Sequence, residues 1–306
     1  MLRKSGLVWL AVVYAAMCVD GLAAPTQDKT GAPNAAVLSQ AQADLATAES
    51  EFASAGLREG VQKSFLAHFA PDAQVFSPFA VPAVDWYRNH PDQPGKLIWA
   101  PEYIAVSATA DLGLSSGPWR YEAERDGKTT TAYGHFFSIW RRNDKGHWEV
   151  LFDNGVSHSS ELTATEATAP VPLTLPAAHR LDPAALAQRR AALEAADTAL
   201  REALARNAPE DAYKTAVAGN VLWLREGSTP VRGLALPSSV SKTPPQSGLG
   251  SGPRVSLGLA ASGDLGYTLG GSENERNKGV DARVWQYRSA GGWKLLADFT
   301  GTVDTP

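Results

Sequence analysis

The chain of 306 residues contains a single cysteine, Cys18, which lies in an apolar segment at the N-terminus. One cysteine cannot form a disulfide within a chain, nor can it supply the several thiolates of a structural zinc site. Removal of the N-terminal segment, argued below, would also remove the only thiol nucleophile. Disulfide scaffolds, thiolate metal centres and cysteine-dependent catalysis are therefore excluded for the rest of the chain.

Basic stretches and long apolar runs are also missing. Lysine and arginine number 28 against 32 aspartates and glutamates, and the formal net charge is −4. No basic run is long enough to follow a phosphate backbone. After the N-terminal segment, no apolar run reaches the roughly 18 residues of a membrane-spanning helix. We expect neither a nucleic acid partner nor a membrane partner for the mature chain.

Metal-ligand spacing is absent as well. No two histidines stand two or four positions apart, and none begins a His-x-x-x-His pattern. The glycine-rich stretch Ser247–Gly252 has no clear strand before it and no helix after it, as a phosphate-binding loop would require. The sequence therefore predicts no metal site and no cofactor.

The N-terminal segment has the three parts of a secretory signal. Arg3 and Lys4 are basic, Gly6–Val19 is an apolar run too short to span a bilayer comfortably, and Leu22–Ala24 offers small residues for cleavage. We assign residues 1–24 to a signal peptide and residues 25–39 to a disordered polar leader. The mature protein is expected to be periplasmic or secreted.

A pattern near the middle of the chain returns near its end. Trp140–Asp153 reads WRRNDKGHWEVLFD and Trp285–Asp298 reads WQYRSAGGWKLLAD, with matching residues 145 positions apart. A period of this size is that of a whole domain, which indicates a tandem duplication. We expect a first domain over residues 40–160, a linker over 161–183 and a more degenerate second domain over 184–306.

Each half begins with helical periodicity and continues with strands. Leu45, Ala48 and Phe52 recur at helical spacing in the first half, and Leu193 and Leu200 do so in the second. Prolines 71 and 209 are expected to break these helical regions. Both halves then carry a D-L-G-x-[ST]-x-G turn and a hairpin ending in the repeated tryptophan pattern. Helices followed by antiparallel strands indicate an α+β fold.

These motifs together give the chain a resemblance to a known family. The Ala48–Phe52 helical stripe, the PDAQVF of Pro71–Phe76, the D-L-G pattern and the W-x-x-x-x-x-G-x-W-x-[VL]-x-x-D ending resemble the SnoaL-like branch of the nuclear-transport-factor-2-like superfamily. The resemblance covers residues 40–158 and, more weakly, 186–302. It implies two tandem cone-shaped barrels, in which a curved, mainly antiparallel sheet wraps the helices around an internal pocket. It also implies pairing of the two domains through their sheets.

Strand parity supplies candidates for proton transfer. In the strand after Tyr133, His135 and Phe137 share one face, while Phe136 and Ser138 share the other. The sequence does not decide which face points inward. If the face of His135 does, His135 pairs with Asp153 across the strands as a carboxylate–imidazole couple. Against this stand a packed histidine with one hydrogen bond and an aspartate that accepts turn hydrogen bonds.

Further candidates come from acidic and aromatic residues. Asp72 follows the helical region, where SnoaL-like sequences often carry an acidic residue, but it also fits a solvated turn. Tyrosines in such sites act as hydroxyl donors, and tryptophans form pocket walls or pack in the core. The pocket candidates of the first domain are Trp86, Trp99, Trp119, Tyr121, Tyr133 and Phe137.

Three functions remain open at this stage. The first is binding of a small apolar or amphipathic molecule in the first domain, with the second domain mainly structural. The second is a SnoaL-like isomerase, cyclase or dehydratase that uses metal-free proton transfer by His135 with Asp153 or Asp72. The third is a protein-interaction module that uses the sheet face. Family resemblance predicts the pocket more firmly than a reaction.

Overall fold

The structure is a computed structural model, and residues from Ser39 onward belong to one compact unit. It describes residues 39–77, 79–92, 94–125, 127–164, 179–206, 209–234, 236–237, 250–271 and 279–302. The expected signal peptide, nearly all of the leader and most of the linker lie outside the described residues. The division into two domains stays a prediction.

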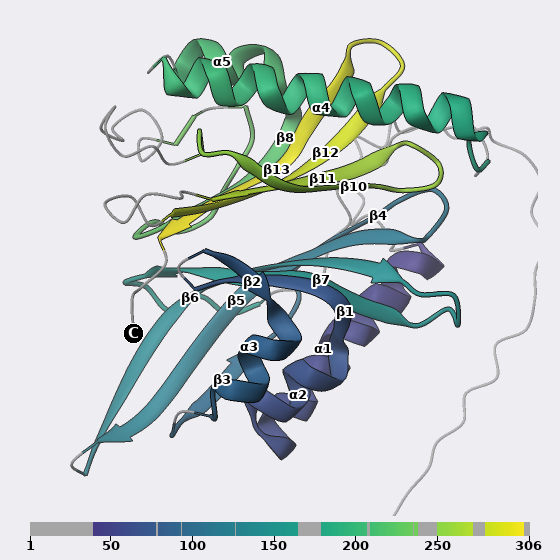
Figure 1. Ribbon diagram of the computed structural model, residues 1–306. Coiled ribbons are helices and arrows are strands. Elements are labelled where there is room, and N and C mark those ends of the chain that lie inside the picture. Colours follow the sequence, from purple (N-terminus) through teal and green to yellow (C-terminus); the bar gives the residue numbers. More distant parts are fainter. Residues whose placement is uncertain are drawn as a thin grey trace, which may run out of the picture. The chain divides into compact units, whose positions relative to one another are not determined.

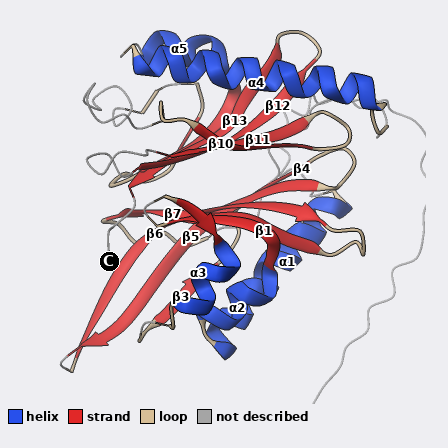
Figure 2. Cartoon of the chain, in the orientation of Figure 1, coloured by secondary structure: helices blue, strands red, loops and turns tan. Residues whose placement is uncertain are grey.

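The first half begins with helices. They are α1 (Gln40–Glu59), α2 (Val61–His68) and α3 (Ala83–Asn89). A capping box starts α1, in which Ser39 and Gln42 exchange side chain to backbone hydrogen bonds. Gly60 separates α1 from α2 at a φ of 95°, a conformation that only glycine adopts without strain. The break turns α2 back over α1, so that both lie on one sheet (Figures 1 and 2).

The first sheet is mainly antiparallel. Its strand order is β2-β1-β7-β6-β5-β3, with β4 also paired to β5, and β1 and β7 form a parallel pair. The strands are β1 (Phe69–Phe76), β2 (Ala80–Pro82), β3 (Lys96–Trp99), β4 (Tyr103–Val106), β5 (Leu112–Arg125), β6 (Lys128–Arg142) and β7 (Trp148–His158).

The second half repeats this order of elements with fewer parts. Helices α4 (Pro183–Ala205) and α5 (Pro209–Ala216) cover one face of its sheet, as Figure 2 shows. The strand order is β10-β11-β12-β13-β8-β9, again with a parallel pair, β8 and β13. The strands are β8 (Val217–Arg225), β9 (Val231–Arg232), β10 (Arg254–Leu259), β11 (Leu265–Gly271), β12 (Gly279–Arg288) and β13 (Gly292–Thr302).

Alternation along β6 and β12 assigns the two faces of each sheet. In β6, Ser138 and Trp140 point toward the helices, since Trp140 donates a hydrogen bond to Glu49 of α1. Phe137 points the other way and packs on Phe299 of β13, with ring centroids 5.5 Å apart. Each sheet therefore has a face that covers its own helices and a face that contacts the other sheet.

The two D-L-G turns contact each other reciprocally. The backbone N–H of Ala108 donates to Asp264 Oδ2 at 2.9 Å, and that of Ala261 donates to Asp111 Oδ2 at 2.9 Å. Thr109 Oγ1 and Ser262 Oγ lie 3.0 Å apart between them. The aspartate of each motif thus satisfies a backbone donor of the other turn. The sequence pattern indicated a turn but not this exchange.

The α+β class and the order of helices before strands are confirmed, whereas two closed cones are not, because neither sheet closes on itself. The proline prediction for the first half is wrong in detail. Pro71 lies inside β1, within an irregularity of the β1–β7 register where its missing N–H is tolerated. In the second half the helical break is confirmed, because α4 ends at Ala205 and Pro209 begins α5, where a proline at the first helical position leaves no backbone bond unmade.

Candidate functional site

A cavity of about 520 Å³ lies between the helices and the sheet of the first half. Its size falls within the range of about 300–1,000 Å³ that is typical of small-molecule sites. Most of its walls are apolar or aromatic, and they come from helices, from both ends of the sheet and from its central strands. The lining residues are Val61, Phe65, Val75, Phe76, Ser77, Trp86, Tyr87, Leu97, Trp99, Trp119, Tyr121, Ala132, Phe136, Asp153, Asn154 and Gly155.

Four of the six predicted pocket residues line this cavity: Trp86, Trp99, Trp119 and Tyr121. The other two are not among its lining residues. Phe137 lies on the opposite face of β6, against Phe299. Tyr133 shares that parity and pairs in register with His158. Strand alternation alone does not choose between the two faces of β6, so these two assignments depended on the wrong choice.

Trp119 forms its wall by lying across two glycines. A Cβ on Gly134 would come within 2.3 Å of the Trp119 ring, and a Cβ on Gly155 would come within 2.7 Å of its Nε1. Both glycines belong to strands that pair with each other, β6 and β7. They therefore leave the room in which the indole lies flat along the sheet.

Asp153 is the acidic side chain among the described lining residues. It stands opposite Ser138 in the register of β6 and β7, and Ser138 Oγ donates to its Oδ1 at 2.5 Å. Burial in this apolar surrounding raises the pKa of Asp153 to about 8, with a smaller contribution from the nearby charge of Glu49 and an opposing one from the Ser138 hydrogen bond. At neutral pH the empty pocket thus favours the neutral carboxyl, a hydrogen-bond donor.

Glu49 is a second buried carboxyl, which the sequence analysis missed. It is fully buried on α1 and accepts from Trp99 Nε1 at 2.6 Å, from Trp140 Nε1 at 3.1 Å and from Ser115 Oγ. Burial raises its pKa to about 7, against the lowering effect of these three donors. An acidic residue on the apolar stripe of a helix was the signal that could have revealed it. Through Trp99, Glu49 fixes one wall of the pocket.

His135 and Asp153 are not brought together, so the predicted carboxylate–imidazole couple is not formed. His135 lies on the sheet-contacting face, with its Nδ1 3.3 Å from His158 Nε2 and its Nε2 3.8 Å from Glu102 Oε2. Asp153 points to the helix-covered face together with Ser138. The physical reason is parity, because residues 135 and 138 of one strand lie on opposite faces.

Asp72 lies apart from the cavity as well. Arg141 donates to both of its carboxylate oxygens, at 2.9 and 2.7 Å, and this pairing lowers the pKa of Asp72. The pair is largely exposed to solvent. Of the three residues proposed for proton transfer, only Asp153 reaches the pocket.

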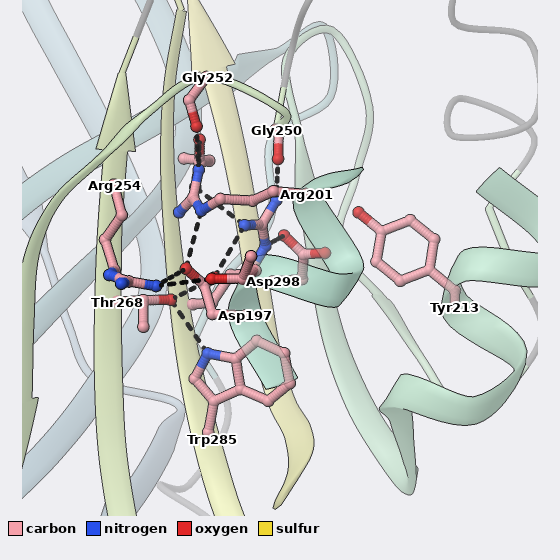
Figure 3. Close-up of polar contacts among 12 residues, drawn as sticks. Asp197, Arg201, Tyr213, Gly250, Gly252, Arg254, Thr268, Trp285 and Asp298 are labelled. Atoms are coloured by element: carbon pink, nitrogen blue, oxygen red, sulfur yellow. Dashed lines mark hydrogen bonds and ion pairs between the residues drawn. The ribbon is translucent and has the colours of Figure 1, made fainter. Parts of the chain in front are cut away.

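In the second half, buried arginines occupy the space between the helix and the sheet (Figure 3). Arg283, which is fully buried, places Nη1 3.2 Å from Asp197 and 3.2 Å from Asp281, and Nε 3.7 Å from Asp298. The other arginines of this cluster are Arg201, bound to Asp197 and Asp281, Arg225, bound to Asp298, and Arg254, bound to Asp197.

The charges of this cluster compensate one another. Burial alone would raise the pKa of Asp197, but Arg283 and Arg201 outweigh it and the pKa is lowered. For Arg283, burial opposes the charge while the surrounding aspartates raise its pKa. Thr268 Oγ1 donates to Asp197 at 2.9 Å and accepts from Trp285 Nε1 at 3.0 Å. The cluster is an ion-paired core, in which Trp285 and Tyr213 pack beside the arginines.

The described part of the chain offers neither a metal-binding cluster nor a membrane-spanning helix. No group of three or more histidine, cysteine, aspartate or glutamate side chains there is arranged to hold a metal ion. Within the same residues no helix is both long and apolar enough to cross a bilayer.

No protein-family model and no curated protein sequence matches this chain. Several solved structures are similar to part of it. A ketosteroid isomerase-like protein from Erwinia carotovora atroseptica is 14% identical over 40% of this chain and 100% of its own, with a TM-score of 0.34. A CamKII hub homology domain from Chlamydamonas reinhardtii is 14% identical over the same shares, with a TM-score of 0.33.

A nuclear transport factor 2 (NTF2-like) superfamily protein from Salmonella enterica is 12% identical over 42% of this chain and 96% of its own, with a TM-score of 0.31. Two of these three neighbours are thus NTF2-like or ketosteroid isomerase-like proteins, and the third is a CamKII hub homology domain. Each corresponds to about two-fifths of the chain, and none assigns a family to the whole.

Proposed function

We propose that the protein binds a small apolar or amphipathic molecule in the pocket of its first half, while the second half is mainly structural. The observation that carries this proposal is the cavity of about 520 Å³ with aromatic walls and one carboxyl side chain among its described lining residues, Asp153. Apolar walls with few polar groups are the usual composition of a small-molecule site. The arginine cluster supports the structural role of the second half, because its positions are taken by ion-paired side chains.

The test is saturable binding of a neutral fluorescent probe, Nile red, and its loss on blocking the pocket. Ala132 lines the cavity but is exposed, so Ala132→Phe adds bulk without disturbing the core. Thr131→Phe is the matched control, because Thr131 is the exposed neighbour on the opposite face of β6. We expect Ala132→Phe to weaken binding at least about tenfold, and Thr131→Phe to leave it unchanged. Equal binding by all three proteins would contradict the proposal.

The chain is further proposed to be a tandem pair of SnoaL-like, cone-type domains, residues 40–160 and 184–306, that pair within one polypeptide. Three features support this. The parallel pairs β1–β7 and β8–β13 recur, the hydroxyl–indole–carboxylate motif of Glu49 recurs at Asp197, and the D-L-G turns exchange hydrogen bonds. Such reciprocity is what an isologous contact between two copies would give. Solution scattering of single halves expressed separately, and of their mixture, tests the pairing.

Export to the periplasm or beyond is proposed from residues 1–24 alone, since they carry the three parts of a secretory signal. N-terminal sequencing of the protein recovered from the periplasm and the medium tests it. Cleavage after Ala23 or Ala24 is the expected result, and recovery of the uncleaved chain only from the cytoplasm would contradict it.

Proton-transfer catalysis is the second candidate function, and the placement of Asp153 favours it in an altered form. Asp153 alone, without His135, would act as acid or base on a bound carbonyl compound, since a carboxyl with a pKa near neutrality serves either role. Deuterium exchange into a bound ketone, lost in Asp153→Asn, is the readout. The sheet face required by an interaction module is already occupied by contacts such as that of Phe137 with Phe299.

A further inference from the structure

Ser138 and Arg283 hold the same place in the two sheets. Ser138 on β6 stands opposite Asp153 on β7, and Arg283 on β12 stands opposite Asp298 on β13. Both lie two residues before the tryptophan whose indole binds the hydroxyl on the neighbouring strand. The first half thus has a short hydroxyl where the second half has a guanidinium.

The carboxyls around this place also correspond. Glu49 and Asp197 are each fully buried on the long helix of their half, and each accepts from the hydroxyl that binds the repeated tryptophan. In the second half, Arg283 lies between Asp197 and Asp298, 3.2 Å from the first and 3.7 Å from the second. The guanidinium of Arg283 therefore lies beside both Asp197 and Asp298, the carboxylates that correspond to Glu49 and Asp153.

A second arginine of the second half, Arg225, also corresponds to a serine of the first half. In the parallel strand pairs, Gln74 stands opposite Phe152, and Leu222 stands opposite Ala297, which is the counterpart of Phe152 in the repeat. Three residues further along the chain come Ser77, which lines the pocket, and Arg225, which forms an ion pair with Asp298 at 3.2 Å. Serine again stands where the second half has arginine.

The described lining residues of the first-half pocket include no lysine or arginine. The hydrogen-bond donors to Asp153 and to the buried Glu49 are neutral: Ser138 for Asp153, and Ser115 with two indoles for Glu49. The pocket therefore presents one carboxyl, Asp153, without the arginine partners that its counterpart Asp298 has in the second half.

We infer that this pocket takes an organic cation, an amine or quaternary ammonium on an apolar or aromatic body, whose positive group lies beside Asp153 as the guanidinium of Arg283 lies beside Asp298 in the second half. The inference rests on the proposed binding function and names its ligand class. The lining tryptophans Trp86, Trp99 and Trp119 fit it, because indole rings attract a cation that has lost its water. An anion would meet Asp153 without a compensating charge.

The charge of the bound ligand affects the number of protons that the protein releases on binding, as well as the affinity. The carboxyl of Asp153, with its raised pKa, is mostly neutral in the empty pocket at neutral pH, and a bound cation favours its ionised form. The titratable groups coupled to it are Glu49 on α1 and Tyr87 on α3. Binding of a cation is thus expected to release about one proton, and binding of a neutral molecule none.

The experiment is isothermal titration calorimetry of the full chain in two buffers of different ionisation enthalpy. The probes are benzyltrimethylammonium and benzylamine, with neopentylbenzene and benzyl alcohol as their neutral counterparts. We expect the cations to bind at least about tenfold more tightly and to release protons. Asp153→Asn keeps an acceptor for Ser138 but loses the charge, so it should weaken cation binding about tenfold and leave neutral binding unchanged.

Neutral probes that bind as tightly as the cations, or an Asp153→Asn variant that binds cations normally, would overturn the inference. If the neutral probes bind as tightly as the cations and Ala132→Phe abolishes the binding of both, the proposed function stands and only the preference for a cation is wrong. If neither the probes nor Nile red bind, both proposals fail.

A second variant copies the second half into the first. Ser138→Arg is expected to place a guanidinium beside Asp153 and to abolish cation binding, with Ser50→Arg on the exposed side of α1 as the control for added charge. Circular dichroism checks that Ser138→Arg folds. If it does not fold, Asp153→Asn decides alone, and cation binding retained by a folded Ser138→Arg would count against the inference.

Discussion

Glu49 and Asp197 meet the same partners: each is a fully buried acid on the long helix of its half, and each accepts a hydrogen bond from a hydroxyl that in turn accepts from a tryptophan indole. Their charges are handled differently. Asp197 is surrounded by arginines, which lower its pKa, whereas Glu49 has only neutral donors, and burial raises its pKa to about 7. The two halves thus build one polar motif with opposite electrostatics.

Glu49→Ala is expected to destabilise the protein by about 3 kcal/mol or more, because it leaves the Trp99 indole N–H and the Ser115 hydroxyl without an acceptor and opens a cavity. Glu51→Ala, at the exposed position two residues later, should change stability by no more than about 0.5 kcal/mol. Urea unfolding measures both. A Glu49→Ala variant as stable as Glu51→Ala would disprove the role of this cluster.

Stability should fall as pH rises, because both buried carboxyls have raised pKa values. For Glu49 the stabilising contribution is complete below the unfolded value of 4.5 and is lost as pH rises through about 7. For Asp153 the corresponding window runs from 3.8 to about 8. We expect urea midpoints of the wild type to decrease across these windows, and Glu49→Gln with Asp153→Asn to flatten the decrease. A wild-type profile that is already flat would contradict the raised pKa values.

Arg283→Met should cost about 3 kcal/mol or more, since the substitution leaves Asp197, Asp281 and Asp298 short of a buried positive charge. Arg206→Ala is the control, because its pair with Glu202 is exposed and contributes at most about 1 kcal/mol. Thermal and urea unfolding provide the comparison. Equal effects of the two substitutions would show that the arginine cluster does not hold the second half together.

His135→Gln should leave ligand affinity in the first-half pocket unchanged within about twofold, since His135 lies on the other face of the sheet. Asp72→Ala should do the same, because Asp72 forms a surface ion pair with Arg141. Probe titration of both variants beside Asp153→Asn is the measurement. A large loss of affinity in His135→Gln would restore the couple predicted from the sequence.

Gly155→Ala should shrink the pocket. The added Cβ would lie within 2.7 Å of Trp119 Nε1, so the indole has to move. We expect probe affinity to fall about three- to tenfold and stability to fall by about 1–3 kcal/mol, because the added Cβ would also lie within 3.0 Å of the His135 carbonyl oxygen. Gly146→Ala, which meets no neighbouring atom but sits at a φ of 82°, is expected to lower stability with unchanged affinity.

The sequence patterns were sufficient to predict the order of the elements and four of the residues that line the pocket. They were not sufficient to predict which face of β6 points toward the helices. Alternation places His135 and Ser138 on opposite faces and says nothing of which face meets the helices. That choice depends on where α1 packs, and the hydrogen bonds of Glu49 fix it. Pro71 was expected to end a helix, although α2 ends at His68 and a register irregularity accommodates the proline inside β1. Local patterns do not report these tertiary contacts.

The turns around Asp111 and Asp264 exchange hydrogen bonds, and both turns belong to one polypeptide. In a symmetric homodimer every substitution occurs on both sides, so a residue that fills one cavity fills its twin. A single chain that carries both sides has no such restriction. Ser138 can remain a small side chain beside Asp153, while the corresponding residue of the second half, Arg283, is a large one beside Asp298. Under the proposed function, one half is then free to specialise in binding a ligand, and the other in stabilising the fold.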